Sequence, residues 1–512
     1  MPTPDIEFFF RWFETLGGYL DREAIDIAQM PASEGGRGVV ALIDIPEGQT
    51  LFSMPRTLLL GVQTSNLRFA FGEEAWKAAK LHERWSGIIL CLMWEAAKGP
   101  ESRWAPYFDI MPIEFDTPMF WSNDELAELN GTAVADKIGK EQVEADYHQK
   151  VLPAMKSRSD LFSPDAIPKY YSLEVYHLMG TRLLTRSFTI EQETDEEPAT
   201  TSQAEDTITA GDISTENDHV DAPLEAKGED EDEDEDEDAD NEDEDTQTTM
   251  VMVPMADMLN ARYKANHAKL FYEPDCLRMV TIKPIKAGEQ ILNTYGNPPN
   301  SELLRRCGHV DYLSLPSELY GDNTFGNPGD IVELPADQVV QVALKVRGHN
   351  ETQEDILERI DWWLEEGGDD VFILEIDDEN PATLESLDIP IAFARLILHD
   401  DEWERAKAKG KPPKPKLEEH TLRVLKEALE RRLQDYATTL EDDERLLTLD
   451  SPPRKRSAII VRIGEKRLLH LFLARTSVLL AKTWPSAKDN GATNSGKRKP
   501  EKGEKSRKRQ KA

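Results

Sequence analysis

The chain has 512 residues, enough for two or three domains with at least one large buried core. Its three cysteines are scattered without paired spacing, which argues against a disulfide framework and against a structural zinc held by four cysteines. No apolar run approaches the roughly 20 residues of a membrane span, and no basic region precedes the first apolar run, so we expect an intracellular protein without a membrane segment.

The net charge of −38 is distributed unevenly. Residues 191–249 hold 27 acidic residues and one lysine, and residues 229–245 alone hold 15 of these acids. Such a block repels itself and buries no apolar surface, so we expect it to be disordered. The apolar pattern resumes directly after it at Met250, which predicts an insertion that loops out of one domain at little cost in loop closure. Recruitment of a basic partner is the alternative interpretation.

The N-terminal part predicts a helix, a glycine turn and two strands. Apolar residues recur at helical spacing over 5–20, after Asp5 as a suitable N-cap. Residues 35–38 read Gly-Gly-Arg-Gly and lead into a predicted strand over 39–45, and a second strand is predicted over 50–54. A glycine turn lets a ligand approach the backbone closely, although most glycine turns bind nothing.

The region 73–185 is predicted to be mainly helical. Apolar spacing predicts helices over 76–81, 85–97, 123–129, 141–155 and 172–184. The last helix ends near Arg186, for which two interpretations stay open. It is either a solvated charge favoured by the helix dipole, or a side chain that points into a site and binds a carboxylate.

Residues 254–308 combine a short polar stretch, two strand-like runs and a Tyr-Gly turn. The polar stretch contains Asp257 and Asn260. The runs over 277–282 and 290–293 predict a hairpin that ends in Asn-Thr-Tyr-Gly, with Tyr295 as its tyrosine. Because functional residues concentrate on loops held by a rigid scaffold, this region is the candidate site.

The C-terminal part predicts a separate helical domain over 330–486. A stripe at helical spacing indicates a packed helix face and contains Leu422, Leu425, Ala428, Leu429 and Leu433. Residues 487–512 carry ten Lys or Arg against three acids and predict a disordered basic tail. The tail resembles a nuclear targeting signal, with a nucleic-acid-binding tail as the alternative. We therefore expect a nuclear location and an import receptor as a partner.

The order of these features resembles that of SET-domain protein methyltransferases: a Gly-Arg-Gly turn with strands, a helical insertion, a DxxN stretch and an Asn-Thr-Tyr-Gly hairpin. The helical insertion and the helical C-terminal region are similar to the Rubisco large-subunit methyltransferase-like class. The wording VPMADMLN, CLRMVTIKPIKAGEQILNTYG and PMFW looks closest to its ribosomal lysine N-methyltransferase 4 branch. The implied fold is α+β, a knotted, β-rich SET domain over 21–312 after an N-terminal helix over 1–20, followed by an all-helical substrate-binding domain.

The resemblance also implies a cofactor and a set of site residues. The cofactor is S-adenosylmethionine, and no metal is expected. Tyr295 matches the catalytic tyrosine, which orients the substrate amine and stabilises the methyl group through weak CH···O contacts. The residues that the resemblance implies for cofactor binding are Gly36, Arg37, Gly38, Arg186, Asp257, Asn260, Ala261, Tyr295 and His309.

Two positions depart from the family pattern. The family has Asn-His where this chain has Asn260 followed by Ala261, whose backbone can still supply hydrogen bonds to adenine. The nearby His267 better matches an entry into the next strand. The family's Tyr-Gly-Phe is Cys-Gly-His here, so His309 replaces an aromatic ring that flanks adenine. Both changes bear on cofactor affinity more than on reaction type.

The resemblance implies an S-adenosylmethionine-dependent protein-lysine N-methyltransferase with a basic protein substrate. The closest branch suggests a protein of the large ribosomal subunit, and complementary charge would speed the encounter with an acidic enzyme. One alternative is a histidine methyltransferase of the same class. Another is a degenerate SET fold that acts as a binding or chaperone-like module. Neither a membrane nor a sequence-specific nucleic acid is expected as a partner.

Overall fold

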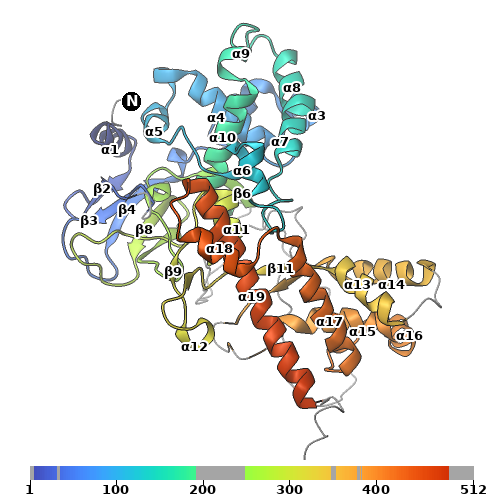
Figure 1. The fold of residues 1–512 in the computed structure, drawn as a ribbon. Helices are drawn as coiled ribbons and strands as arrows, with labels where there is room; N and C mark the ends of the chain where they lie inside the picture. The colour runs from blue at the N-terminus through green and yellow to red at the C-terminus, as the bar shows by residue number, and fades with distance from the viewer. Residues whose placement is uncertain are drawn as a thin grey trace, which may run out of the picture.

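The computed structural model describes residues 5–31, 35–191, 248–347, 353–377, 381, 383 and 385–483. Most of the acidic insertion and all of the basic tail lie outside these residues, so what the sequence predicts for them stays a prediction. Figure 1 shows the strands on one side of the molecule, the helical insertion above them and the C-terminal helices below. Within the described ranges, no helix is long and apolar enough to cross a membrane.

The N-terminal helix α1 (Ile6–Thr15) confirms the prediction for this segment. The Asp5 side chain caps it by accepting the Phe8 N–H (2.8 Å). Its apolar face is buried, and Trp12 stacks on Tyr107 of α5 (Ala105–Ile110) with ring centroids 6.4 Å apart. Helix α1 is therefore packed against Tyr107 of the helical insertion.

The main sheet has four antiparallel strands in the order β1-β4-β8-β7. Its strands are β1 (Tyr19–Leu20), β4 (Thr50–Pro55), β8 (Cys276–Thr281) and β7 (Ala268–Tyr272). A second pair joins β2 (Ile25–Gln29) to β3 (Arg37–Ala41). The strand predicted over 39–45 is thus shorter and starts earlier, whereas the strand over 50–54 is confirmed as β4.

A further pair of strands flanks the acidic insertion. β5 (Ser187–Glu191) and β6 (Thr248–Met252) are antiparallel, with Glu191 opposite Thr248. The chain therefore leaves and re-enters this part of the fold at one point, as an insertion into a single domain requires.

The helical insertion contains most of the helices that precede the candidate site. They are α2 (Leu67–Phe71), α3 (Glu73–Ala78), α4 (Ser86–Ala97), α5, α6 (Asn123–Ala127), α7 (Lys140–Asp146), α8 (Leu152–Ser157), α9 (Ile167–Tyr170) and α10 (Leu173–Arg186). A π-helical turn (Tyr147–Val151) joins α7 to α8, which makes the helix predicted over 141–155 continuous. The helices predicted over 85–97, 141–155 and 172–184 are confirmed, the one over 123–129 ends two residues earlier as α6, and the one over 76–81 lies three residues earlier as α3.

The hairpin predicted from residues 277–282 and 290–293 is wrong. β8 pairs with β4 and β7 instead. Residues 290–293 run beside β3, where the Ile291 N–H donates to the Val39 carbonyl (2.8 Å). The turn between the two runs is held by Asp44, which accepts hydrogen bonds from Lys286 and from the Ala287 N–H. The turn therefore leads from one sheet to another rather than between neighbouring strands.

The C-terminal region is mostly helical, as predicted, but it also contains one pair of strands and is therefore not all-helical. Its helices are α13 (Ala336–Arg347), α14 (Gln353–Glu365), α15 (Asp388–Leu398), α16 (Asp400–Lys409), α17 (Glu419–Arg432), α18 (Leu440–Leu447) and α19 (Pro453–Thr483). The strand β12 (Val371–Leu374), which the sequence did not predict, pairs with β11 (Val332–Pro335). The leucine stripe lies on α17 and packs into the core of this region.

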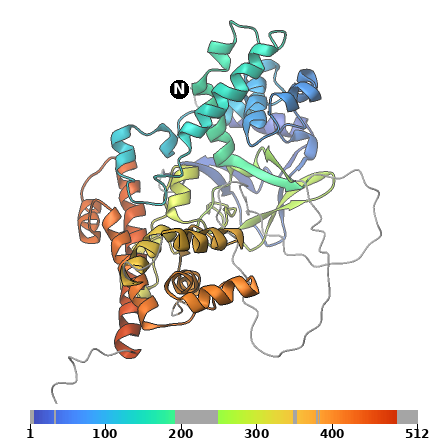
Figure 2. The same ribbon diagram turned by 90° about the vertical axis from the view of Figure 1, so that its right-hand side faces the viewer.

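Short elements link the two parts of the molecule. They are α11 (Asn300–Glu302) with a π-helical turn (Leu303–Cys307), β9 (Leu313–Ser314), α12 (Ser317–Tyr320) and β10 (Phe325–Gly326). Figures 1 and 2 both show the long helix α19 running from the neighbourhood of α18 along the C-terminal helices. Helices α11 and α19 are in contact, so the chain just after Tyr295 lies against the C-terminal region.

Candidate active site

The Gly-Gly-Arg-Gly turn folds directly against Asn260. A Cβ on Gly35 would lie 2.4 Å from the Asn260 Nδ2, and a Cβ on Gly38 would lie 2.8 Å from the same atom. Gly36 has a φ of +74°, and a Cβ there would meet nothing within 4 Å. Glycine is thus required at two positions by close packing, whereas the backbone of Gly36 keeps an open face that a ligand can approach.

The Asn260 amide joins segments that are far apart in the sequence. Its Nδ2 donates to the Arg37 carbonyl (3.1 Å), 223 residues away, and to the Gln290 Oε1 (2.8 Å). The amide nitrogen therefore holds the glycine turn in place, and a direct contact between Asn260 and the cofactor stays a prediction. The sequence analysis missed Gln290, although a polar residue beside the apolar pair Ile-Leu is the signal that could have found it.

A buried carboxylate, that of Asp257, lies at the end of α10. The Arg186 Nη1 is 2.7 Å from the Asp257 carbonyl oxygen and 3.3 Å from its Oδ2. The Tyr107 hydroxyl donates to the same Oδ2 (2.7 Å). Arg186 thus points into the site and binds a carboxylate, which decides between the two interpretations left open by the sequence. Burial raises the pKa of Asp257 against the lowering influence of Arg186 and Tyr107.

Two further arginines, Arg37 and Arg182, lie near Arg186. Burial, with the charge of Arg186, lowers the pKa of Arg182 to about 10 and also lowers the pKa of Arg37. The Arg182 Nε donates to the Pro112 carbonyl (3.0 Å), and the Arg37 guanidinium donates to the Ile110 carbonyl. Arg186 and Arg37 therefore both act on the Asp257 carboxylate, with Arg182 beside Arg186, and the excess positive charge suits an anionic group such as the carboxylate of a bound amino acid.

The sequence analysis assigned no site role to Tyr107 or Arg182. Tyr107 is fully buried in the hydrophobic core. Its hydroxyl nevertheless supports Asp257, at a sequence separation of 150 residues. No local pattern marks such a pair.

Tyr295 comes from the turn that follows residues 290–293. Its hydroxyl donates to the Leu259 carbonyl (3.1 Å), so it lies against the Asp257–Asn260 stretch. Burial raises the pKa of Tyr295, and the neighbouring Cys307 and Asp257 add to the shift. The phenol is therefore neutral at physiological pH. Its oxygen keeps lone pairs that can accept a hydrogen bond from an amine or a CH···O contact.

The residues around Ala261 show how the chain fits without the family's histidine. Ala261 forms a parallel bridge with Asn293, whose N–H donates to the Asn260 carbonyl (2.9 Å). The His267 Nδ1 instead accepts the Leu292 N–H (3.2 Å) at the entry to β7, as the sequence analysis expected for that position. His267 therefore holds a strand in place and does not substitute for the missing side chain.

His309 follows Gly308, whose φ is +75°. A Cβ on Gly308 would lie 2.8 Å from the Thr117 nitrogen, so the turn packs tightly against the helical insertion. Burial lowers the pKa of His309, which leaves a neutral imidazole at pH 7. Its contact with adenine stays a prediction. Among the described residues, no cluster of His, Cys, Asp or Glu has the arrangement of a metal site.

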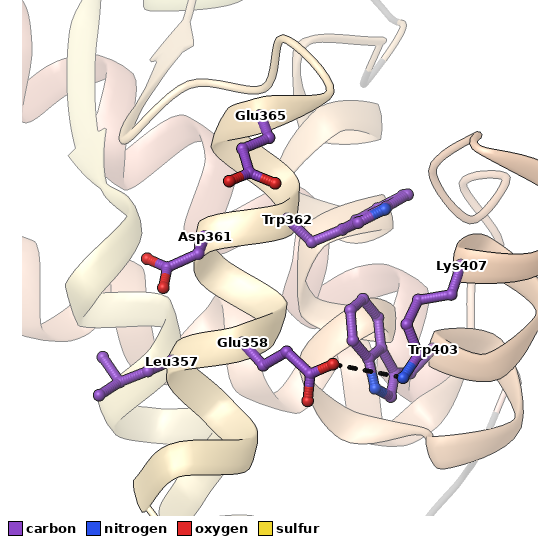
Figure 3. Close-up of a pocket in the computed structure, with 7 residues that line it drawn as sticks. All are labelled: Leu357, Glu358, Asp361, Trp362, Glu365, Trp403 and Lys407. Atoms are coloured by element: carbon purple, nitrogen blue, oxygen red, sulfur yellow. Dashed lines mark hydrogen bonds and ion pairs between the residues drawn. The ribbon is translucent and has the colours of Figure 1, made fainter.

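A separate groove lies in the C-terminal region, between α14 and α16 (Figure 3). It has a volume of about 440 Å³, and its side chains combine carboxylates with indole rings: Glu358, Asp361, Glu365, Trp362 and Trp403. The Lys407 Nζ lies 4.4 Å from the Trp403 ring centroid and 3.4 Å from the Glu358 Oε1. The groove already accommodates one ammonium group of the protein itself, held by a cation–π contact and an ion pair.

Two family models match the chain. The SET domain model matches residues 36–296, and the Rubisco LSMT substrate-binding model matches residues 353–469. Together they cover the glycine turn, the site residues up to the Tyr295 turn, and the helices that carry the groove.

Three curated relatives are similar to this chain. The N-lysine methyltransferase SETD6 of Homo sapiens is 31% identical over 467 residues, covering 86% of this chain and 85% of the relative. The SETD6 of Bos taurus is 29% identical over 93% of this chain and 96% of the relative. The ribosomal lysine N-methyltransferase 4 of Saccharomyces cerevisiae is 30% identical over 60% of this chain and 56% of the relative.

Solved structures of Rubisco LSMT share the fold over nearly the whole chain. The structure bound to AdoMet has a TM-score of 0.58 at 20% identity, covering 96% of this chain and 98% of the other. The structure bound to lysine and AdoHcy has a TM-score of 0.58 at 19% identity. The predicted α+β fold is confirmed, and the chain belongs to the SET-domain protein-lysine methyltransferases of the Rubisco large-subunit methyltransferase-like class.

Proposed function

We propose that this protein transfers a methyl group from S-adenosylmethionine to a lysine of a basic protein, with Tyr295 as the catalytic residue. The observation that carries the proposal is the convergence of three distant segments. The glycine turn at 35–38 packs on Asn260, and the Tyr295 hydroxyl donates to the Leu259 carbonyl one residue before it. Tyr295 and the glycine turn therefore both contact the short stretch at Leu259 and Asn260, which supports the proposal.

The residues present fit the cofactor. The open backbone of Gly36 and the unpartnered, buried Oδ1 of Asp257 offer polar groups, and the arginines around Asp257 favour the carboxylate of the cofactor's amino-acid end. When bound, S-adenosylmethionine supplies a methyl group that its sulfonium charge has already activated. Arg37 and Arg186 would hold the amino-acid end, and the glycine turn would meet it through the backbone.

The protein's task is then to present a neutral amine. A lysine has a reference pKa near 10.4, so only about one amine in a thousand is neutral at pH 7. The ammonium would lose its proton to solvent, and the nitrogen lone pair would then form the bond to the methyl carbon as the carbon–sulfur bond breaks and its electron pair leaves with the neutral thioether. The Tyr295 oxygen, whose own proton is donated to Leu259, can accept from the remaining N–H and fix the direction of attack. Catalysis is then mainly a matter of positioning.

The test is Tyr295→Phe, measured with labelled donor on a lysate and on the identified substrate. We expect a loss of kcat of about 100-fold, because one positioned polar contact at a reacting group is removed. Donor binding by calorimetry should stay within a few fold. Tyr19→Phe, at a half-exposed tyrosine far from the site, is the matched control.

The outcomes separate the alternatives. Labelling that survives Tyr295→Phe unchanged would remove this residue from the mechanism. Absence of donor binding at millimolar concentration would favour a degenerate SET fold that acts as a binding module. Mass mapping of the labelled residue distinguishes lysine from histidine.

We further propose that the substrate is a basic protein of the large ribosomal subunit. The name of the yeast relative, ribosomal lysine N-methyltransferase 4, supports a ribosomal substrate, and the acidic charge of this chain supports a basic one. Purified large-subunit proteins offered beside a total lysate test this. Labelling confined to non-ribosomal proteins would contradict it.

The groove between α14 and α16 is our candidate for the contact with the body of that substrate. Its carboxylates and indoles suit lysine or arginine side chains, and Lys407 already occupies one such position. Reversing Glu358, Asp361 and Glu365 to Lys should raise KM for the whole protein about tenfold and leave a short target peptide unaffected. Reversing the exposed Glu23, Glu47 and Glu318 makes the same charge change elsewhere. Equal effects of the two triple variants would mean that the net charge of the protein, and not the groove, determines KM.

We also propose a nuclear location, with residues 487–512 recognised by an import receptor. The support is the composition of this tail, whose ten Lys or Arg face three acids. A fluorescent fusion of the full chain should accumulate in nuclei, and removal of the tail should abolish that. Unchanged accumulation without the tail would overturn the assignment.

A further inference from the structure

The turn that carries Tyr295 has few polar groups with which the fold can hold it. After Tyr295 the sequence reads Gly-Asn-Pro-Pro-Asn, and the two prolines have no backbone N–H to donate. Gly296 is bonded within the turn to Thr294, and the Pro298 carbonyl and the Asn300 N–H are the first backbone groups after the tyrosine that bond to a distant segment. Asn300 begins α11 and is fully buried.

Both groups form hydrogen bonds with one short turn at residues 327–330, about 30 residues later in the sequence. The Asn327 Nδ2 donates to the Pro298 carbonyl (2.9 Å), and the Asn300 N–H donates to the Asp330 Oδ1 (2.8 Å). Asn327 and Asp330 are 3% and 8% exposed, so neither bond competes with water. The carboxylate also suits the N-terminus of the helix, where backbone N–H groups need acceptors.

The turn at 327–330 is itself fixed. The Gly329 N–H donates to the Asn327 Oδ1 (2.9 Å), and the Asp330 N–H donates to the Asn327 carbonyl (3.1 Å). A Cβ on Gly329 would lie 2.7 Å from the Asn297 carbonyl oxygen. A Cβ on Gly464 of α19 would lie 2.1 Å from the Asp330 Oδ2. The turn is therefore wedged between the Tyr295 turn and the longest helix of the C-terminal region.

The opposite side of the Tyr295 turn is held by the Asp257–Asn260 stretch and the residues after it. The Tyr295 hydroxyl donates to the Leu259 carbonyl, and the Lys264 N–H donates to the Asn297 Oδ1 (3.2 Å). The turn is thus held by both segments, which also meet each other where Gly329 packs on the Tyr263 ring. Loss of either grip leaves the tyrosine free to shift relative to the glycine turn.

We propose that Asn327 and Asp330 are positioning residues for Tyr295, and that through them the C-terminal region sets the geometry of the active site. This inference rests on the proposed methyl transfer. Neither residue touches the reacting atoms, and both act through the backbone of the Tyr295 turn. Because misplacement of a reacting group by about 1 Å costs up to about 100-fold in rate, the effect belongs in kcat.

The test compares Asn327→Ala, Asp330→Ala and Asp330→Asn in the full chain with a short target peptide. We expect the two alanine variants to lower kcat about tenfold, with KM and the donor Kd within about twofold of wild type. Asp330→Asn keeps an acceptor for the Asn300 N–H and should restore most of the rate. Asn327→Asp sets an acceptor against the Pro298 carbonyl and should cost at least as much as Asn327→Ala.

A control separates positioning from general loss of stability. Asp443→Ala removes a buried carboxylate of α18 that is bonded to α19 and touches nothing in the Tyr295 turn. It should lower Tm and leave kcat unchanged at temperatures where the protein is folded. Unchanged kcat in both alanine variants, an equal loss in Asp330→Asn and Asp330→Ala, or an equal loss in Asp443→Ala would each overturn the proposal.

A readout without turnover keeps the two proposals distinct. Hydrogen exchange at the Asn300 amide should speed up at least tenfold in Asp330→Ala and not in Asp443→Ala. If wild type shows no methyl transfer while this exchange result holds, the proposed function fails and the grip on the turn stands. If wild type is active and the exchange of Asn300 is unchanged, the positioning role fails alone.

Discussion

At the residue scale, the site depends on how closely two backbones approach. The glycine turn and Asn260 are in contact only because residues 35 and 38 lack a side chain. Gly38 does not have a positive φ, so its need for glycine is one of space rather than of conformation. A substitution at Gly38 therefore tests the packing of the cofactor turn, because it adds no backbone strain that could also change affinity.

We predict that Gly38→Ala lowers donor affinity about tenfold, which corresponds to about 1.4 kcal/mol. The new methyl group would lie 2.8 Å from both the Asn260 Nδ2 and the Gln290 Oε1, so their hydrogen bond (2.8 Å) must break or the turn must move. Calorimetry with S-adenosylmethionine measures the change. Gly180→Ala in α10, where the added Cβ meets only Ile89 at 3.4 Å, should leave the Kd within twofold. Equal Kd values for the two variants would refute the packing argument.

The sequence could predict the residues of the site that belong to local motifs. Gly36, Asn260 and Tyr295 each lie in a short pattern, and the structure brings their segments together. Tyr107 could not be predicted, because its role is defined by a partner that the fold supplies from 150 residues away. Gln290 has only a weak local signal, and its role depends on Asn260, 30 residues away. The direct cofactor contacts of Ala261 and His309 stay predictions.

At the element scale, helices were easier to predict than strand partners. The helices follow from local apolar spacing, and capping residues such as Asp5 and Ser172 confirm their starts. Strand pairing depends on distant segments. Residues 290–293 lie beside β3, and β12 pairs with β11 across a helical pair, so neither arrangement is visible in a local pattern.

A buried ion cluster lies between α18 and α19. The Asp443 carboxylate is fully buried and lies 2.7 Å from the Arg462 Nη2 and 2.6 Å from the Lys466 Nζ. Arg462 also reaches the Glu128 carboxylate of the helical insertion (3.1 Å). One carboxylate therefore balances two buried cations at the contact between the two parts of the molecule.

We predict that Asp443→Ala lowers the free energy of unfolding by about 3–5 kcal/mol, because it leaves the buried Lys466 without its counter-ion and Arg462 with Glu128 alone. Urea denaturation followed by circular dichroism measures it. The matched control is Asp401→Ala, which removes an exposed ion pair with Arg405 (3.0 Å) and should cost no more than about 1 kcal/mol. The prediction fails where Asp443→Ala is no more destabilising than Asp401→Ala.

At the scale of the whole molecule, a buried polar seam joins the helical insertion to the C-terminal helices. The Arg432 Nη2 donates to the Gly131 carbonyl (2.8 Å), and the Ala133 N–H donates to the Glu465 Oε1 (3.0 Å). Asp330 lies near the same seam, against α19. Burial raises the pKa of Asp330 and of Glu465 to about 7, and the repulsion between the two carboxylates adds to the shift of Asp330.

These shifts predict that part of the stability is lost as pH rises. A carboxyl group with a folded pKa of about 7 binds its proton more tightly than the same group in the unfolded chain, whose pKa is about 3.9. Its contribution is fully present below pH 4 and is lost as pH rises through 7. The three histidines at 177, 267 and 309 have lowered pKa values and act in the opposite direction, so wild type alone does not isolate the carboxylates.

The variant Asp330→Asn isolates the contribution of the Asp330 carboxyl group to the pH dependence of stability. The asparagine cannot ionise, and the histidines are common to both proteins. The free energy of unfolding of the variant minus that of wild type should rise from pH 4 to pH 8, by at most about 4 kcal/mol for a shift of about three pH units. Arg467 and Glu465 face this carboxyl and are present in both proteins. Urea denaturation at pH 5, 6.5 and 8 measures the difference. A difference that is constant across this range would mean that Asp330 is ionised in the folded protein throughout, and that its negative charge, rather than its proton, is what α11 and α19 hold between them.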